Sequence, residues 1–426
     1  MGASQLTSGQ MIVQRGLRVA FQPIIDIDAS TVVGYEALAR GPVGSPLESP
    51  AALFAAARAA GCLAELDAEC RAQAFRSAIA SDYLAPLTLF VNVEPEILDG
   101  APLDDLLSIA NSAPRELRVV FEITERAIAA RPAELLRTVE RIRARRWAVA
   151  LDDVGADPSS LAFMSLLRPE VVKLDLRLVQ QRPTSEIAAI MHAVNAYTEA
   201  SGALLLAEGV ETPEHLATAR GLGARFAQGW LFGRPGTEPS PLPVADANLP
   251  RVPAELSTDR SPFACLAPGT PLRRAGKRLL IELSKKLEQE ALAQGRTAIL
   301  TAAFQEARHF TVPTATRYRQ IAEGCAFVCA LGEGLPVQPI RGVRGAELSR
   351  EDVVIGEWDV IVIAPHFSAA LLARDLGDSG PDLDRTFEYA LTYRRDTCVR
   401  AASALLSRVV PAVTGRAIPE DLQDAA

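Results

Sequence analysis

Polar side chains stand within or at the end of several short apolar segments in the first half of the chain. The segments are rich in Val, Ile, Leu and Phe, as buried strands are. The polar residues are Glu36 in VVGYEAL, Asn92 in LFVNV, Glu122 in VVFEI, Asp152 and Asp153 in VALDD, Lys173 in VVKLD, Glu208 in LLLAE and Gln228 in FAQGW. Burying an isolated carboxylate in an apolar strand is costly. The recurrence therefore indicates a shared chemical role.

Several carboxylates that meet at one site stay ionised only if cations lie between them. Carboxylate and amide oxygens are ligands for hard cations, so Mg²⁺ or Mn²⁺ is expected, with two ions favoured. A pair of such ions, ~3.5–4 Å apart, stabilises both the attacking and the leaving oxygen of a phosphoryl group. The acids thus predict a metal-dependent phosphoester hydrolase.

Lys173 supports this prediction because lysine is rare in the chain. The other lysines are Lys277, Lys285 and Lys286, whereas arginine is used throughout. A compact ammonium at a strand end suits a place beside a water molecule or a phosphate, where a planar guanidinium would not fit.

A structural explanation competes with the chemical one. A single acid at a strand end is commonly the N-cap of the next helix, and this explains Asp152 or Asp153 easily. It does not explain Glu122 or Glu208, which follow apolar residues inside their strands.

Eight strand candidates must position these residues. They cover residues 19–27, 32–38, 87–93, 117–123, 147–153, 171–175, 203–208 and 225–232. Helical patterns lie between most of them, as at 135–146 and 186–200. This alternation predicts a parallel α/β barrel, in which all the strands end at one mouth; a doubly wound open sheet is the alternative.

The rest of the chain predicts a second domain. Nine of the 29 prolines lie between Pro235 and Pro271, which predicts a linker over 237–271. Residues 272–410 then form a smaller α/β or α+β domain, followed by a tail over 411–426. This domain begins with an amphipathic helix over 272–293, which either packs on its own domain or pairs with a second copy.

Composition excludes several classes of function. The net charge of −8 disfavours extended binding of nucleic acid. Six cysteines without a CxxC pair, together with four histidines, argue against a zinc site. No apolar stretch is long enough to span a membrane and the start lacks a signal sequence, so a cytoplasmic protein is expected.

Eight ordered motifs resemble a known family. They are FQPI (21–24), YEALAR (35–40), FVNVEP (90–95), FEITER (121–126), LDDVG (151–155), VVKLD (171–175), AEGVET (207–212) and QGWLFGRP (228–235). Through them, residues 12–236 resemble the EAL domain, a TIM-like (β/α)8 barrel that hydrolyses the bacterial second messenger cyclic di-GMP. The resemblance implies a phosphodiesterase that yields the linear dinucleotide pGpG, and a homodimer.

The resemblance also implies a role for each matched residue. Glu36, Asn92, Glu122, Asp152 and Asp153 match ligands of two metal ions. Glu208 matches the general base, and Lys173 matches a lysine that orients the water or the phosphate. Arg40 matches a phosphate-binding arginine, and the remaining substrate positions are Gln22, Leu38, Asp175, Gln228 and Pro235. Glu125 and Glu211 match residues that support the loops.

One segment departs from the family. The chain reads DDVGADPSSL where the family usually has DDFGTGYSSL, in a loop that shapes the second metal site and the dimer contact and is held by the residue matching Glu125. Asp157 and Pro158 restrict the backbone there. We expect a competent site with an altered loop. The alternatives are a catalytically weak or inactive receptor for cyclic di-GMP, and an unrelated phosphoesterase on the same scaffold.

The C-terminal region resembles the DICT sensory domain, which occurs with diguanylate cyclases and two-component systems. The resemblance rests on residues 302–322, 356–377 and 387–396. It implies regulation of the barrel by a ligand or protein that the sequence does not identify. Aromatic and histidine side chains that either line a ligand pocket or pack in a core are Phe304, His309, Tyr318, Trp358, His366 and Tyr393.

Overall fold

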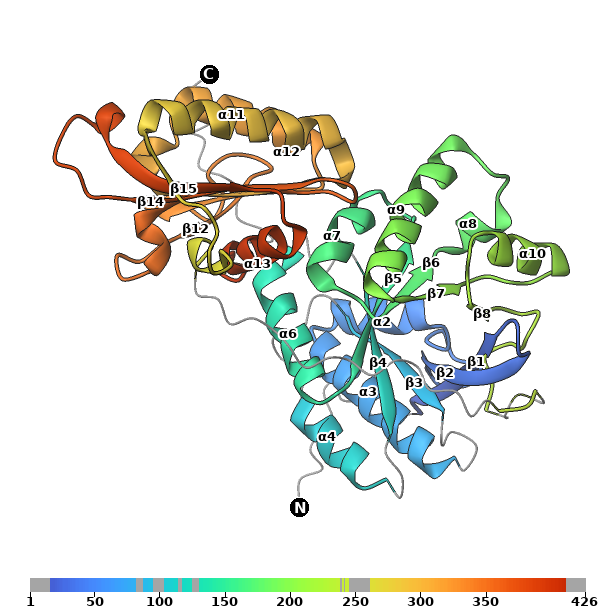
Figure 1. Ribbon diagram of the computed structural model, residues 1–426. Helices are drawn as coiled ribbons and strands as arrows, with labels where there is room; N and C mark the ends of the chain where they lie inside the picture. Colours follow the sequence, from blue (N-terminus) through green and yellow to red (C-terminus); the bar gives the residue numbers. More distant parts are fainter. Residues whose placement is uncertain are drawn as a thin grey trace, which may run out of the picture.

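The computed structural model describes residues 16–81, 87–94, 103–113, 117–124, 130–237, 240, 242–244 and 261–410 of the 426-residue chain. Figure 1 shows an N-terminal barrel surrounded by helices and, against one side of it, a C-terminal domain built on a separate sheet. The predicted fold class is therefore confirmed. The exact domain boundaries stay a prediction.

Eight of the described strands close into a barrel in chain order. They are β1 (Arg18–Asp26), β2 (Thr31–Arg40), β3 (Thr88–Asn92), β4 (Arg118–Thr124), β5 (Ala148–Val154), β6 (Val171–Leu174), β7 (Leu204–Ala207) and β8 (Phe226–Gln228). The closed barrel excludes the doubly wound alternative.

The prediction that all strands are parallel is wrong for β1. This strand runs antiparallel to both β2 and β8, whereas β2 to β8 are parallel to one another. The reason is a short turn over 27–30 in place of a crossover helix. Asp26 Oδ1 stabilises this turn by accepting hydrogen bonds from the amides of Asp28 and Ala29, both at 3.1 Å.

Helices pack around the barrel and begin at recognisable N-terminal signals. They are α2 (Pro50–Ala59), α3 (Leu63–Ala80), α4 (Leu103–Asn111), α6 (Pro132–Ala144), α7 (Ser159–Leu167), α8 (Leu176–Gln180), α9 (Ser185–Ser201) and α10 (Pro213–Gly221). Ser49, Thr184 and Thr212 cap α2, α9 and α10 through their side-chain oxygens. Gly202 ends α9 in the left-handed conformation, which glycine adopts at little cost.

Apolar side chains fill one layer of the barrel, and the polar residues form the layer above. The apolar layer contains Ile24, Val33, Phe90, Val120, Ala148, Ala150, Val171, Leu206 and Phe226. Side chains two residues apart on a strand share a face. Val120 is therefore followed on the same face by Glu122, Val171 by Lys173 and Leu206 by Glu208. The strands thus place the polar residues at their C-terminal ends, next to a layer of apolar side chains.

The C-terminal domain is a mixed seven-stranded sheet in the order β12-β11-β10-β13-β14-β15-β9. Its strands are β9 (Arg273–Gly276), β10 (Ile299–Glu306), β11 (Phe327–Glu333), β12 (Arg344–Glu347), β13 (Glu357–Ile363), β14 (Ser368–Asp375) and β15 (Thr386–Thr392). Three of these are parallel neighbours, β10 to β12, and the other pairs are antiparallel.

Helices cover both faces of this sheet (Figure 1). The face away from the barrel carries α11 (Lys277–Gln294) and α12 (Val312–Gly324), and the other carries α13 (Arg395–Leu406). Helix α11 packs on its own domain through Leu280, Leu287 and Ala291, which is the first of the two arrangements that the pattern allowed. The helix predicted from residue 272 is wrong at its start, because residues 273–276 pair with β15 as strand β9.

The two domains share a continuous apolar core. Phe163 of α7 packs edge to face on Phe327 of β11, with ring centroids 6.3 Å apart. Arg395 of α13 donates a hydrogen bond to Ser165 Oγ at 2.9 Å. Helix α7 directly follows β5, so the C-terminal domain contacts the element next to Asp152 and Asp153.

The structure describes only parts of the predicted linker. Residues 261–271 pack on the C-terminal domain, where Ser261 donates a hydrogen bond to the Glu357 carboxylate at 2.5 Å. Residues 245–260, like the tail over 411–426, lie outside the described part of the chain. In that described part, no helix is both long enough and apolar enough to cross a membrane.

Candidate active site

Lys173 lies at the centre of the polar layer. Its side chain is 1% exposed, and its Nζ lies 2.7 Å from Glu122 Oε1, 3.0 Å from Asp152 Oδ1 and 2.8 Å from Glu208 Oε1. The fourth carboxylate, Glu36, is 4.0 Å away. Strands β2, β4, β5, β6 and the end of β7 thus bring these predicted residues together.

Amide side chains hold Glu36 from two sides. Asn92 Nδ2 donates to Glu36 Oε1 at 2.9 Å, and Gln228 Nε2 donates to Glu36 Oε2 at 2.6 Å. Gln228 Nε2 also lies 3.1 Å from Gln22 Oε1. Because Asn92 donates through its nitrogen, its side-chain oxygen is oriented by the same contact and can serve as a metal ligand.

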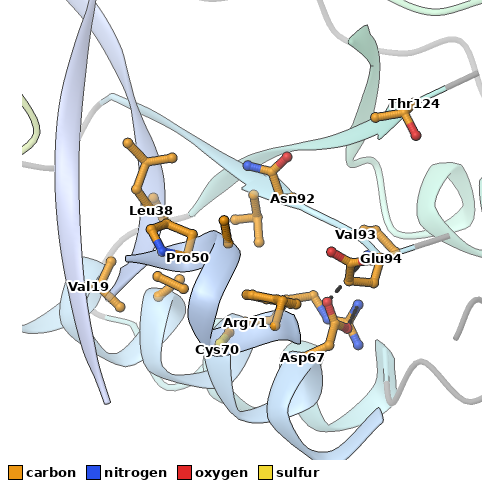
Figure 2. Close-up of a pocket in the computed structure, with 16 residues that line it drawn as sticks. Val19, Leu38, Pro50, Asp67, Cys70, Arg71, Asn92, Val93, Glu94 and Thr124 are labelled. Carbon is orange, nitrogen blue, oxygen red and sulfur yellow. Dashed lines mark hydrogen bonds and ion pairs between the residues drawn. The ribbon is translucent and has the colours of Figure 1, made fainter. Parts of the chain in front are cut away.

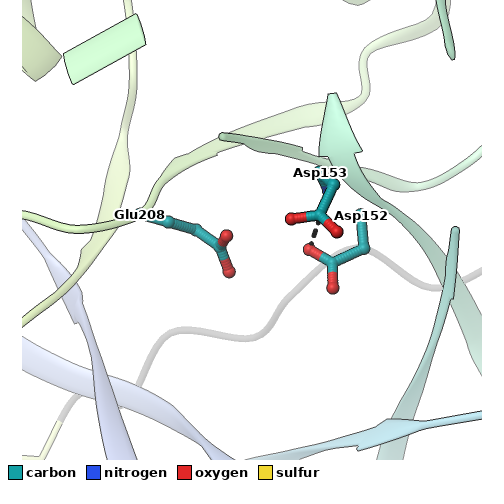
Figure 3. A group of neighbouring side chains, drawn as sticks. All are labelled: Asp152, Asp153 and Glu208. Carbon is teal, nitrogen blue, oxygen red and sulfur yellow. Dashed lines mark hydrogen bonds between the residues drawn. The ribbon is translucent and has the colours of Figure 1, made fainter. Parts of the chain in front are cut away.

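A local irregularity in β5 brings two consecutive aspartates to the mouth. The pairing of β5 with β6 shifts register between Leu151 and Val154, and Asp153 has a φ of 54°. In a regular strand, neighbouring side chains point to opposite faces, and such a shift relieves that restriction. Ligand atoms of Asp152, Asp153 and Glu208 lie within 4.8 Å of one another. Figure 3 shows the three side chains pointing toward a common space.

The environment shifts the protonation of these groups strongly. Burial raises the pKa of Glu208 to about 8, although Lys173 acts in the opposite direction. Burial and the charge of Glu36 raise the pKa of Glu122 well above its usual value. For Glu36, burial is outweighed by Lys173 and two amide donors, so its pKa is lowered. The carboxylates hold the pKa of Lys173 well above its usual value, despite its burial.

Negative charge is in excess at the mouth. Within the described residues, five carboxylates (Glu36, Glu122, Asp152, Asp153 and Glu208) share this space with the single ammonium of Lys173. A raised pKa at Glu122 and Glu208 is the response expected when too few cations are present. Oxygen donors with surplus negative charge fit hard divalent cations.

The remaining predicted positions lie around this centre and have local partners. Arg40 ends β2, and its Nη1 donates to the Ala39 carbonyl at 2.8 Å. Burial lowers the pKa of Arg40. Asp175 caps α8 by accepting a hydrogen bond from the Arg177 amide at 2.9 Å, so a structural role suffices for it. Pro235 is half-buried and lies next to Gly236, which pairs with Phe21 of β1.

Of the two predicted loop-support residues, the structure describes Glu211. Glu211 is exposed, and its amide donates to His215 Nδ1 at 3.3 Å. Glu125 lies outside the described residues, so its role stays a prediction.

A cavity of about 340 Å³ lies beside the mouth, between the barrel and helices α2 and α3 (Figure 2). Leu38 and Asn92 line it together with Asp67 and Arg71, an ion pair that is almost fully buried. Burial raises the pKa of Asp67 to about 6. Sequence reasoning missed this pair. Its signal was present, because Asp67 and Arg71 stand four residues apart on the otherwise apolar stripe of α3.

The altered loop after β5 is held by contacts within the barrel and by one from the other domain. Asp157 Oδ1 accepts a hydrogen bond from the Ser159 amide at 2.8 Å, at the start of α7. The Asp157 Oδ2 atom lies 3.2 Å from Arg296 Nη2 of the C-terminal domain. Asp157 therefore connects the segment after Asp153 to that domain.

The aromatic residues predicted for the C-terminal domain separate into different places. Phe304, His309 and Trp358 line one cavity. Tyr318 is buried against Phe304, and Tyr393 lies at a different hollow. His366 contacts His192 of α9 in the barrel.

Comparison with known proteins finds a matching family model for each of the two domains. A family model described as "EAL domain" matches residues 7–235, and one described as "Sensory domain in DIguanylate Cyclases and Two-component system" matches residues 266–376. These matches confirm the two predicted resemblances.

Relatives and solved structures each match part of the chain. The chain is 35% identical over 158 residues to the cyclic di-GMP phosphodiesterase RocR of Pseudomonas aeruginosa. This match covers 36% of the chain and 40% of that protein. It is 27% identical over 230 residues to the probable cyclic di-GMP phosphodiesterase PdeN of Escherichia coli, covering 51% and 43%. The chain spans between 27% and 43% of the length of four curated relatives.

Among solved structures, the chain is similar to the Klebsiella pneumoniae BlrP1 complex with calcium and cyclic di-GMP at pH 8.0. The sequence identity is 28% and the TM-score is 0.47, over 57% of this chain and 60% of that one.

Proposed function

Because the chain belongs to the EAL domain family, we propose that it is a metal-dependent phosphodiesterase that hydrolyses cyclic di-GMP to linear pGpG. The names of its relatives RocR and PdeN support this substrate. The observation that carries the proposal is the set of four carboxylates around Lys173 at the barrel mouth, with Asp153 beside two of them. We further propose that the C-terminal sensory domain regulates this activity.

The proposed metal ligands are Glu36, Asn92, Glu122, Asp152 and Asp153. Two Mg²⁺ or Mn²⁺ ions held there would neutralise the phosphate and lower the pKa of a water molecule. The surplus negative charge of these residues supports the assignment.

The chain's own side chains then perform the remaining work. Glu208 accepts the proton of the attacking water. Its pKa is about 8 without metal ions, and cations bound beside it would lower that pKa and keep the carboxylate ionised. Lys173, 2.8 Å from Glu208 Oε1, fixes the direction of that carboxylate. Arg40 binds a phosphate of the dinucleotide. Gln22, Leu38, Asp175 and Pro235 would line the pocket for the guanine and phosphate groups, and Gln228 would lie at its rim.

Glu208→Gln tests the proposal because glutamine keeps the shape of the side chain but cannot act as a base. We expect turnover of cyclic di-GMP, measured with Mg²⁺ or Mn²⁺, to fall about 10²–10⁴-fold. Binding of the dinucleotide in Ca²⁺, measured by calorimetry, should change little. Glu199→Gln, an exposed change on α9, is the matched control.

The same two assays separate the alternatives. Unchanged turnover in the Glu208→Gln variant would refute the assignment of the base. Binding without turnover in the unmodified protein would favour a receptor, and absence of both would reject cyclic di-GMP as the ligand.

A further inference from the structure

The C-terminal domain contains a cavity of about 310 Å³ on the face of its sheet that points away from the barrel. Helix α11 forms one wall, the segment from β10 to the start of α12 forms another, and β13 supplies part of the floor. This volume lies at the lower end of the range for small-molecule sites. Its described lining combines a compact apolar floor with charged and polar groups, and nothing in the barrel contributes to it.

Rigid aromatic side chains make the floor of the cavity. Phe304 is fixed edge to face against Phe310 and Tyr318, with centroids 5.2 and 5.4 Å apart. Trp358 packs edge to face on Phe387 at 5.7 Å. Rings held in this way offer flat apolar surfaces without further loss of conformational entropy, and such surfaces favour a planar ligand.

Positive charge outweighs negative charge around the cavity. Of the described residues that line it, the cations are Lys277, Lys285, Arg308 and Arg317, and the carboxylates are Glu288 and Asp382. Most of these cations are exposed or already paired, as Arg317 is with Glu288 at 2.7 Å.

Lys277 differs from the other cations because its side chain is only 8% exposed. Its Nζ lies 2.5 Å from Asp382 Oδ2 and 6.0 Å from the Trp358 ring centroid. Burial lowers the pKa of Lys277, against the effect of Asp382. The carboxylate therefore compensates the desolvation of this ammonium only in part, and a second anionic group would stabilise it.

One side chain that lines the cavity has an unmet hydrogen bond. Ser284 is 5% exposed, and its Oγ has no hydrogen-bond partner among the described residues. His309 does not add to this set, because its Nδ1 lies 2.9 Å from the Phe304 carbonyl and its Nε2 lies 3.3 Å from Asp382 Oδ1. Buried polar groups are normally satisfied, so the Ser284 hydroxyl indicates a bound molecule with a polar substituent.

We propose that this cavity binds a small planar aromatic compound that carries one anionic group, with the ring on Trp358 and Phe304 and the anion at Lys277. The proposal rests on the C-terminal domain alone and does not depend on the activity of the barrel.

A series of probes that share one naphthalene ring and carry substituents of different charge tests the proposal on the full chain. The probes are 2-naphthoate, 2-naphthamide and 2-naphthylmethylamine, which are anionic, neutral and cationic, and binding is measured by isothermal titration calorimetry. We expect 2-naphthoate to bind at least tenfold more tightly than the amide and the amine to bind most weakly. Equal binding of all three, or no binding of 2-naphthoate at millimolar concentration, would overturn the proposal.

Two variants locate the binding in this cavity. Lys277→Met should weaken 2-naphthoate at least tenfold and remove its advantage over the amide. Lys286→Met, a change on the same helix at an exposed lysine paired with Glu290, should leave binding unaltered. Ser284→Leu fills the cavity without changing its charge and should weaken all the probes together. Unchanged binding in both Lys277→Met and Ser284→Leu would place the site elsewhere and refute the proposal.

Discussion

At the scale of single residues, Lys173 sets the charge balance of the barrel mouth. Its ammonium lies within 3.0 Å of three carboxylates, and its side chain is 1% exposed. Arginine could carry the same charge, but its planar fork would need more room at this buried point. The single lysine of the barrel thus compensates part of the charge that the candidate metal ligands bring.

Lys173→Met should destabilise the protein strongly when metal is absent. We expect the free energy of unfolding, measured in EDTA at pH 7.5 by chemical denaturation, to fall by about 3–5 kcal/mol, because the carboxylates lose their partner. In the folded variant, the pKa values of these carboxylates should lie above their values in the unfolded chain. Such groups stabilise the folded state at low pH and lose that effect as pH rises, so the deficit should shrink near pH 5.

One result would contradict this electrostatic explanation. A deficit that stays the same at pH 5 and pH 7.5 would show that the loss comes from packing rather than charge. Lys286→Met serves as the control for replacing an exposed lysine.

Individual site residues were predictable where they broke a simple pattern. Glu122 and Glu208 stand out because acids are rare within apolar strands, and the structure places both on Lys173. Arg71 and Ser284 gave weaker signals. Serine and arginine are common on helices, and their burial depends on which face the tertiary packing covers. The substrate contacts of Arg40 and Pro235 stay predictions, as does Glu125.

At the scale of elements, the segment from β5 to α7 connects the acids to the second domain. Asp157 accepts a hydrogen bond from the Ser159 amide and pairs with Arg296, which stands in η4 (Gly295–Thr297) just after α11. The departure from the family sequence at this loop thus coincides with the point that the C-terminal domain contacts. Helix α11 also forms a wall of the cavity around Lys277.

Arg296→Ala should loosen this loop with little loss of overall stability. An exposed ion pair contributes at most about 1 kcal/mol, so the unfolding free energy should change by less than that. Amide hydrogen exchange over 153–158, measured by mass spectrometry, should nevertheless become several-fold faster. Arg278→Ala removes a similarly exposed pair with Asp384 and should leave that exchange unchanged. Identical exchange in both variants would show that Arg296 does not restrain the loop.

The elements themselves were largely predictable, but their directions were not. All eight barrel strands coincide with apolar segments read from the sequence. The antiparallel direction of β1 was missed because alternation of apolar residues does not encode strand direction. Strand β9 was missed because its residues, RRAG, continue directly into the charged pattern of α11, and pairing with β15 decides their conformation.

At the scale of the whole molecule, the C-terminal domain covers the outer side of α7. The shared core includes Phe163 and Leu167 of α7 together with Phe327 and Leu405 of the second domain. Sequence patterns predicted both domains but not this contact, because an apolar helix face does not specify what covers it. A homodimer, which the family resemblance implies, would therefore have to use other surfaces than this covered side of α7.

The two domains also meet at a pair of histidines that should make their contact sensitive to pH. His192 Nδ1 of α9 and His366 Nε2 lie 2.9 Å apart, so one ring must donate and the other accept. Burial lowers the pKa of His366, and His192 and Arg395 add to the effect. Arg168 and Asp396 form a weaker pair at 3.9 Å across the same contact. Protonation of both rings would leave two donors facing each other.

The sign of the pH effect follows from the lowered pKa of His366. Because the pKa of His366 is lower when the domains are docked, the docked state binds fewer protons than the undocked state. Docking is therefore favoured above the unperturbed histidine pKa of about 6.5 and is weakened as the pH falls below it. We expect the thermal midpoint to fall more between pH 7.5 and 5.5 in the unmodified protein than in His366→Gln, whose amide can still hydrogen-bond but does not titrate. His215→Gln, a change remote from the contact, should retain the full pH dependence. If His366→Gln retained it as well, other groups would control the docking of the two domains at low pH.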